Sequence, residues 1–362
     1  MKKHVILVAG YEYHHGRTNL TRLCKQRANV ILHQKASWHN DAEVKFTLFD
    51  VKNGQIETGR VNGNQIDWSL ERDDFDAIDD GSHYTAERHF VQRETDVISV
   101  TDAYKYLQDV GNNDSGTLHE FTLLGHGWRG GPVLVNSYQR SDYLRNGSNA
   151  MARDPWDKDG RQKDTNLTNM GMVEWQRFVQ AFNGSGHVWV WGCASSRLFK
   201  TVILKVLRSP EFGNKRYGSH VDTDTFTLRF NRSFAEEYFE YDTLFFFRSR
   251  TSSAITELSL TRTFREVKDF LIRGMVHTYA AQMAYNTGVK VYAALPGTGA
   301  DYERGGRANR RVMVVPKNTS VYGYGYNSIL RFYKTYLSMQ EDPEQRGYAL
   351  YDPLQITRWK SG

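Results

Sequence analysis

Two short apolar runs, each ending at a glycine beside a reactive side chain, constrain the fold of this chain more than any other feature. His126 follows the glycine that ends the run Phe121–Leu124, and Cys193 follows the glycine that ends Val188–Trp191. Continuous apolar runs bounded by turn signals are typical of buried parallel strands. Sites in open α/β sheets form beyond the carboxyl ends of such strands. We therefore expect His126 and Cys193 to emerge side by side if the two strands are neighbours.

The remaining apolar patterns alternate between strand and helix periods. The predicted strands are 5–9, 43–51, 55–61, 121–124, 132–135, 188–191, 225–230, 243–247, 289–295 and 311–315, and the predicted helices are 19–33, 100–110, 172–182, 198–207, 264–287 and 328–337. A polar loop is predicted at 72–81. Alternation of this kind indicates an α/β fold in three layers, with a mostly parallel central sheet and helices on both faces.

Shifts in pattern suggest how the chain is divided. Residues 1–211 form the first part of the predicted catalytic core, and the polar, Asp-rich stretch 136–169 within it is interpreted as an insertion. Residues 212–263 change to short alternating runs, which predicts an accessory β-rich segment. Residues 264–362 are then expected to continue the core and to form the C-terminal region.

Composition narrows the class of protein. The chain has 362 residues, 40% of them hydrophobic, and a formal net charge of +6, which fits a globular protein rather than a disordered one. Its two cysteines, Cys24 and Cys193, exclude a disulfide framework. A basic stretch runs through Arg304, Arg307, Arg310 and Arg311. We interpret it as a solvated loop, so nucleic acid is not an expected partner.

The location of the protein is predicted from two absences in the sequence. The apolar core near the amino end spans only Val5–Ala9, shorter than a secretory signal needs. No apolar stretch approaches the roughly 20 residues of a membrane span. The expected location is therefore a reducing cytoplasm without a membrane span, with signal-independent secretion as the alternative.

Cys193 and His126 together have the chemistry of nucleophilic catalysis. A thiolate attacks carbonyl carbon once a base has removed its proton, and a neutral His is the usual base. The backbone N–H groups of Gly127 and Cys193 are candidates for an oxyanion hole. Taken alone, a cysteine at a strand end is more often a small buried hydrophobe. The joint pattern, His-Gly after one strand and Gly-Cys-Ala-Ser after the next, is more specific.

At these residues the chain resembles the caspase-like cysteine peptidases, a group that includes caspases, legumain, gingipains and separase. His126-Gly127 and Gly192-Cys193 match the strand ends of that group, and the turn from Gly192 to Leu198 looks like the separase-type nucleophile turn. The spacing is longer than in many members, which the stretch 136–169 would explain. The resemblance implies a Cys-His dyad, a protein or peptide substrate and no required cofactor.

The resemblance also suggests two residues for substrate selection. In caspases an Arg in the loop after the first strand binds an acidic residue of the substrate, and Arg17 occupies a comparable place here. In members that cleave after basic residues, an acid in the pocket has the inverse role. Asp301, in a loop after a predicted core strand, is the candidate for it. Either residue is otherwise an ordinary surface charge.

Other site types are weakly supported or absent. The loop from Asp154 to Gly160 is similar to a calcium loop but lacks the EF-hand ligand pattern, which leaves a non-EF calcium site that activates the enzyme as an alternative. Adjacent His14 and His15 do not predict a metal site. The sequence contains no Gly-x-x-x-x-Gly-Lys phosphate-binding loop and no Gly-x-Ser-x-Gly motif.

Three functions are consistent with these patterns. The first is a caspase-like cysteine endopeptidase, which would suit a bacterial effector or toxin. The second is a hydrolase in which Ser195 or Cys193 attacks an ester or amide of a lipid or cell-wall substrate. The third is a non-catalytic protein that binds its partner through an aromatic and basic surface.

Overall fold

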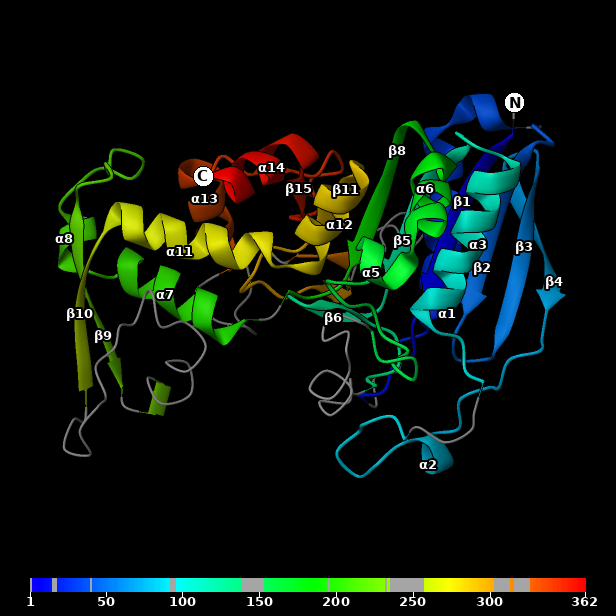
Figure 1. Cartoon of the computed structure of the whole chain (residues 1–362), viewed down its shortest axis with the longest axis horizontal. Helices are drawn as coiled ribbons and strands as arrows, with labels where there is room; N and C mark the ends of the chain where they lie inside the picture. The colour runs from blue at the N-terminus through cyan, green and yellow to red at the C-terminus, as the bar shows by residue number, and fades with distance from the viewer. Residues whose placement is uncertain are drawn as a thin grey trace.

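The computed structural model describes residues 2–14, 18–39, 41–91, 96–137, 153–194, 196–231, 233–234, 257–302, 313–315 and 326–362. Within them it is a mixed α/β structure built around a nine-stranded sheet of order β14-β15-β11-β8-β5-β1-β2-β3-β4 (Figure 1). In chain order these strands are β1 (Lys3–Ala9), β2 (Val44–Asp50), β3 (Gln55–Asn62), β4 (Gln65–Arg72), β5 (Leu118–Leu124), β8 (Phe182–Trp191), β11 (Lys290–Ala293), β14 (Gln340–Glu341) and β15 (Ala349–Tyr351).

The centre of the large sheet is parallel and its edges are antiparallel. β11, β8, β5, β1 and β2 pair in parallel. β3 and β4 extend one edge as an antiparallel meander, and β15 and β14 extend the other edge in the same way. The predicted sheet, mostly parallel at its core, is therefore confirmed in this coarse form.

Helices cover both faces of the sheet, and the side chains of β1 show why. Ile6 and Val8 contribute to the core under α3 (Val100–Asn113) and α6 (Met172–Ala181), whereas Val5 and Leu7 contribute to the core under α1 (Leu20–Gln34). Successive strand residues point to opposite faces, so an all-apolar strand requires cover on both. β1 is apolar from Val5 to Ala9 and fully buried there.

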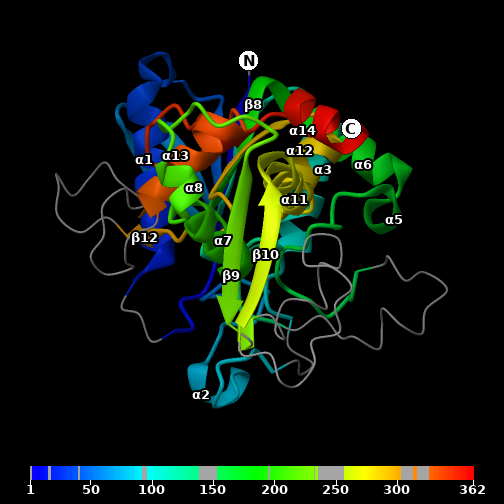
Figure 2. The ribbon, with the colours of Figure 1, turned by 90° about the vertical axis from the view of Figure 1, so that its left-hand side faces the viewer.

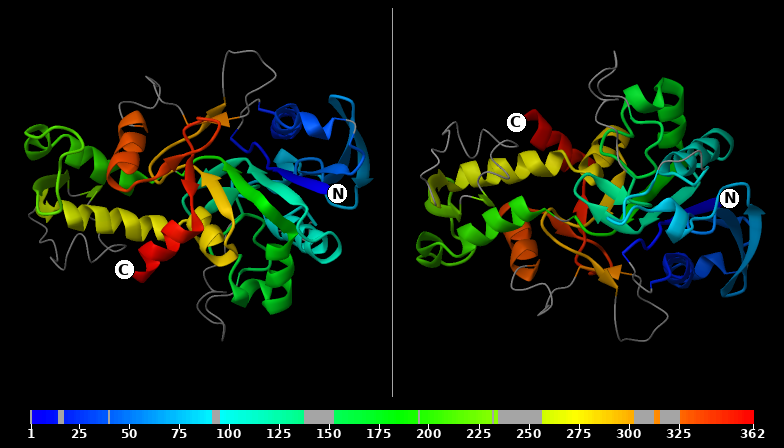
Figure 3. Two further views of the ribbon diagram at one scale, coloured as in Figure 1. Left: turned by 90° about the horizontal axis from the view of Figure 1, so that it is seen from above. Right: turned by 90° about the horizontal axis from the view of Figure 1, so that it is seen from below.

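A second group of elements lies to one side of the large sheet, as Figures 1 and 2 show. It comprises α7 (Arg197–Leu207), α8 (Pro210–Gly213), the antiparallel pair β9 (Thr225–Asn231) and β10 (Glu257–Thr263), α11 (Phe264–Val276) and α13 (Tyr326–Tyr336). α12 (Tyr279–Thr287) contacts α14 (Pro353–Ser361), which also lies beside α11 (Figure 3). The described part of the predicted accessory segment thus includes a β pair, and the division into domains stays a prediction.

Short elements connect these layers. They are η1 (Ala36–Trp38), α2 (Asp80–His83), the hairpin β6 (His126–Trp128) and β7 (Gly131–Val133), α5 (Leu167–Met170), and the pair β12 (Asp301–Tyr302) and β13 (Met313–Val314). In the described part of the chain, none of the helices has both the length and the apolar character that crossing a membrane requires.

Several predicted elements are corrected. The stretch 264–287 is two helices rather than one, because the Thr278 side chain accepts a hydrogen bond from the Ala281 N–H at 3.2 Å and starts a new helix. β4 was not predicted, because most of its side chains are exposed and its apolar alternation is weak. β14, β15 and α14 were also missed. The predicted strand 243–247 lies outside the described residues.

Candidate active site at the ends of β5 and β8

The two strands that carry the reactive side chains are direct neighbours. β5 pairs in parallel with β8, with Leu124 opposite Trp191, and the Gly125 N–H donates to the Trp191 carbonyl at 3.1 Å. His126 and Cys193 therefore leave the sheet at the same edge. The sequence prediction of adjacent strand ends is confirmed, whereas the catalytic roles of the two residues stay predictions.

Glycines let the backbones of the two turns touch. A Cβ atom on Gly127 would lie 2.7 Å from the Cys193 carbonyl oxygen and 3.4 Å from its nitrogen. A Cβ on Gly192 would lie 3.2 Å from the His126 carbonyl oxygen. A side chain at either position would push the turns apart. The backbone of Gly127 thus lies directly against Cys193, and the oxyanion-hole role of their N–H groups stays a prediction.

Glu12, in the loop after β1, makes a hydrogen-bond contact with His126. Its Oε1 lies 2.9 Å from His126 Nε2, with the Glu12 side chain 8% exposed and that of His126 24% exposed. A carboxylate oxygen accepts a hydrogen bond from an N–H group, so this contact assigns the proton to Nε2. Nδ1 is then the hydrogen-bond acceptor of the neutral ring. Glu12 was missed by sequence reasoning. The one sequence feature that could have identified it is its position just beyond the end of a buried central strand.

The loop that carries Glu12 is held from both sides. The Gly10 N–H donates to the Leu124 carbonyl at 2.9 Å, and the Tyr11 N–H donates to the Leu134 carbonyl at 2.6 Å. Leu134 is in turn held by Asp159, whose Oδ1 accepts its N–H at 2.7 Å. These bonds fix the loop against the strand end that precedes His126.

The Tyr13 ring packs beside His126. Its ring centroid is 4.7 Å from that of His126. Burial raises the pKa of the Tyr13 phenol, and Asp159, Glu12 and Cys193 lie near enough to raise it further. The hydroxyl is therefore protonated at neutral pH and remains a hydrogen-bond donor beside the site.

The Cys193 thiol is held in position by the loop after β11. Its Sγ lies 3.2 Å from the Ala300 N–H, which donates to it, and 3.6 Å from the Ala300 carbonyl, to which the thiol donates. An isolated bridge between Ala194 and Thr298 holds the same loop, with the Ala194 N–H 3.1 Å from the Thr298 carbonyl. Cys193 is half-buried, whereas Cys24 is fully buried. Cys193 is therefore the cysteine that a reagent or substrate can reach.

A small hollow of about 20 Å³ opens beside Cys193. This volume suits one water molecule or a methyl group. Its lining residues are mainly small or aromatic: Trp128, Arg129, Gly131, Val190, Gly192, Cys193, Ala194, Thr278, Tyr279, Ala280, Ala293, Ala294 and Tyr351. We call it the Cys193 hollow.

The two residues predicted to select the substrate have different outcomes. Asp301 begins β12, pairs with Val314 and directly follows Ala300, but it does not line the Cys193 hollow. Arg17 lies outside the described residues, as do Ser195 of the alternative hydrolase and the basic stretch 304–311. The roles of Arg17 and Asp301 stay predictions.

Carboxylates of the Asp-rich loop that suggested a calcium site bind backbone N–H groups and arginines. Asp159 accepts the backbone N–H groups of Leu134 and Val135 at 2.7 and 2.9 Å. Arg161 pairs with Asp157 at 2.5 Å, and Asp164 has a similar partner in Arg153. No group of three or more His, Cys, Asp or Glu side chains among the described residues is arranged to hold a metal ion.

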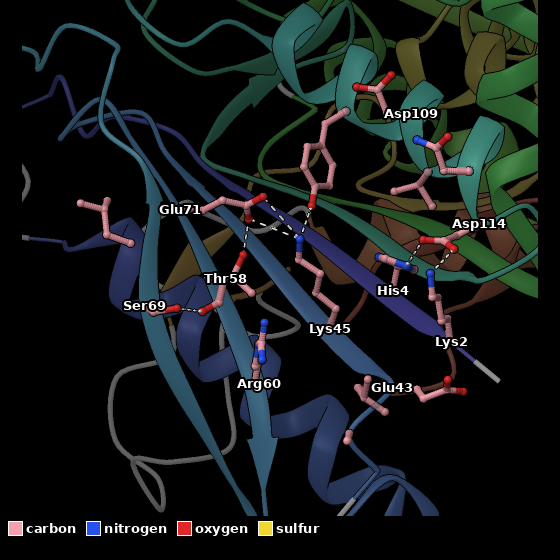
Figure 4. A pocket seen from close by; sticks show the side chains of 16 residues that line it. Lys2, His4, Glu43, Lys45, Thr58, Arg60, Ser69, Glu71, Asp109 and Asp114 are labelled. Atoms are coloured by element: carbon pink, nitrogen blue, oxygen red, sulfur yellow. Dashed lines mark hydrogen bonds and ion pairs between the residues drawn. The ribbon is translucent and has the colours of Figure 1, made fainter.

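A much larger groove, of about 770 Å³, lies elsewhere on the protein. It is lined by the start of β1, the sheet edge β2–β4 and α3, and Figure 4 shows Lys2 paired with Asp114 and Lys45 paired with Glu71. Lys2 pairs with Asp114 at 2.6 Å, and Lys45 lies 3.4 Å from Glu71. The groove begins at the amino end of β1, whereas sites in parallel sheets form at carboxyl ends. We therefore place the candidate site at His126 and Cys193.

Comparison of the chain with models of known protein families, with curated proteins and with solved structures found no match.

Proposed function

We propose that the protein is a caspase-like cysteine endopeptidase, in which Cys193 is the nucleophile and His126 the general base and acid. The proposal is supported above all by one observation. Two neighbouring strands end in turns that touch, one carrying a reachable thiol and the other an imidazole paired with Glu12. A thiol, a histidine and a group that orients the histidine are the parts that nucleophilic catalysis requires.

The reaction would proceed in two steps. His126 Nδ1 takes the thiol proton, and Sγ forms a bond to the substrate carbonyl carbon, whose electrons move to the oxygen. The N–H groups of Gly127 and Cys193 are the proposed partners of that oxyanion. The oxyanion collapses, the C–N bond breaks, and His126 returns the proton to the leaving amine. Water, deprotonated by His126, then hydrolyses the thioester and releases the acid.

Glu12 is the proposed positioning residue in this scheme. Its carboxylate holds Nε2 at 2.9 Å, which orients the ring and stabilises the imidazolium that forms during attack. We expect Glu12→Gln to lower kcat about 10- to 100-fold with little change in KM, because the substrate does not contact this residue in the scheme. A Glu12→Gln enzyme with unchanged kcat would contradict the role.

The deciding experiment compares the wild type with Cys193→Ala. Both are incubated with a diverse peptide library, and cleavage is read by mass spectrometry. Cleavage by the wild type alone would support Cys193 as nucleophile. A matched ester substrate tests the rival hydrolase. Ester cleavage without peptide cleavage would support that rival. So would an activity that is lost in Ser195→Ala but retained in Cys193→Ala. Absence of both activities in the wild type would contradict the peptidase proposal and favour a binding protein.

A further inference from the structure

Arg129, in the turn between β6 and β7, borders the Cys193 hollow. Its position is fixed by the backbone, because its carbonyl accepts the Tyr279 N–H at the start of α12 at 3.0 Å. Trp128, next to it in the same hairpin, also lines the hollow and is 46% exposed. The hairpin that begins at His126 thus carries two large side chains to the rim of the site.

Arg129 is half-buried and, unlike nearby Arg153 and Arg161, has no carboxylate partner among the described residues. Arg153 and Arg161 form ion pairs at 2.5 Å with Asp164 and Asp157. Among the described residues no ion pair involves Arg129, whose guanidinium carbon lies 5.8 Å from the Phe199 ring centroid. Burial lowers the pKa of the Arg129 guanidinium, and no acid among the described residues opposes this shift.

Lys360 adds a second positive charge to the same region. Burial lowers the pKa of His277, and the charges of Lys360 and Arg129 lie near enough to lower it further. A half-buried guanidinium in positive surroundings has lost part of its hydration without gaining an anion. A carboxylate of a bound molecule would supply the missing anion, and the planar guanidinium can donate two parallel hydrogen bonds to such a group.

The shape of the hollow limits how that carboxylate can arrive. Its wall is built from small and aromatic residues, and it holds only about 20 Å³. A long side chain cannot enter, so the carboxylate must sit on a short arm at the rim, as in an aspartate side chain or a free peptide C-terminus. Both present the same chemistry to Arg129.

On the basis of the proposed function, we propose that Arg129 is a specificity-determining residue that binds a substrate carboxylate close to the bond that Cys193 attacks. Sequence reasoning placed carboxylate binding at Arg17 and gave Asp301 the inverse role of binding a basic substrate residue. Arg129 gave no signal of its own, because only the hairpin brings it to the hollow that Cys193 lines.

The first test uses the thiol itself and needs no peptide cleavage. Iodoacetate and iodoacetamide both alkylate a thiolate, forming an S–C bond while C–I breaks and iodide leaves, but only iodoacetate carries a carboxylate. We expect Arg129→Gln to lower the ratio of the iodoacetate rate to the iodoacetamide rate at Cys193 by about tenfold. Arg129→Lys, which keeps the charge but not the paired donors, should give an intermediate ratio.

Mass spectrometry assigns the alkylated cysteine, and buried Cys24 serves as the unreactive reference. Arg60→Gln is the matched control, because Arg60 is an exposed arginine on β3 that lines the distant groove. Its alkylation ratio should equal that of the wild type. An unchanged ratio in Arg129→Gln, with a thermal melt like that of the wild type, would overturn the proposal.

A second test identifies the source of the carboxylate. Peptides that differ only as Asp against Asn beside the cut, or as C-terminal acid against amide, are compared by kcat/KM in wild type and Arg129→Gln. A preference of about tenfold for one acid, lost in the variant, identifies the source. No preference in cleaving wild type would overturn the substrate role. Absence of Cys193-dependent cleavage would contradict the proposed function instead, while the alkylation ratio would still report on Arg129.

Discussion

At the scale of single residues, the site depends on positions where a side chain would not fit. Gly127→Ala would place a methyl group 2.7 Å from the Cys193 carbonyl oxygen, so the two turns must separate. We expect the free energy of unfolding to fall by about 1–3 kcal/mol and Cys193-dependent cleavage to be lost. Chemical denaturation and the peptide assay measure the two effects.

Gly184→Ala provides the control for that substitution. Gly184 is an exposed position in β8, and a Cβ there would meet nothing within 4 Å. Its stability should stay within about 0.5 kcal/mol of the wild type, with normal cleavage. If Gly127→Ala behaved like Gly184→Ala, the close contact between the two turns would be wrong.

At the scale of elements, the break between α11 and α12 places the start of α12 at the Cys193 hollow. The Thr278 hydroxyl accepts the Ala281 N–H at 3.2 Å and donates to the Met275 carbonyl at 2.8 Å, so it joins the two helices. We expect Thr278→Ala to lower the free energy of unfolding by about 1–2 kcal/mol, and Thr278→Ser, which keeps the hydroxyl, to lower it less.

The N-cap of α11 provides a control that distinguishes a loss of overall stability from a change at the Cys193 hollow. Thr263 caps α11, where its hydroxyl accepts the Glu266 N–H at 3.2 Å, and it does not line the hollow. Thr263→Ala should lose stability while Cys193 keeps its alkylation rate with iodoacetamide. Thr278→Ala should change that rate as well. Equal alkylation rates in both variants would show that the start of α12 does not shape the site.

At the scale of the whole molecule, a buried histidine makes stability depend on pH. His119 is 8% exposed, and burial lowers its pKa to about 4 from an ordinary value of 6.5, with His187 adding to the effect. The unfolded chain therefore binds a proton that the folded chain does not between about pH 6.5 and pH 4. Stability should fall as the pH falls through this window, by at most about 1.4 kcal/mol per pH unit for this group.

Denaturation curves between pH 4 and 8 measure this slope. His119→Gln should flatten it, although burial also lowers the pKa values of His4 and His277, which act in the same direction. His33→Gln, at an exposed position of α1, should leave the slope unchanged. A His119→Gln protein with the wild-type slope would contradict the assignment.

The buried charges of the molecule show what sequence reasoning could not reach. Arg27 of α1 binds Glu120 of β5 at 2.8 and 2.6 Å and Glu344 at 2.5 Å, across 93 and 317 positions of the chain. Nothing local marks these residues as buried partners. Burial would raise the pKa of Glu120, but Arg27 and His187 together hold it well below its usual range.

The sequence by itself determined the elements whose signals are local. Apolar runs that stop at glycine predicted β1, β5 and β8, and the hairpin signal predicted β2 and β3. The same runs placed His126 and Cys193 at one edge of the sheet, because the carboxyl ends of neighbouring parallel strands lie together. The polar strand β4 and the joint between α11 and α12 were missed, because exposure and capping there leave weak or ambiguous periodicity.

Only the tertiary structure decided which side chains surround that pair. Glu12 reaches His126 because β1 lies beside β5, and Arg129 borders the hollow because its hairpin meets the start of α12. Neither neighbour is encoded by spacing, since each contact joins segments far apart in the chain. Periodicity reports how a segment meets the core, whereas the partners of a charged side chain depend on which segments the completed fold brings together.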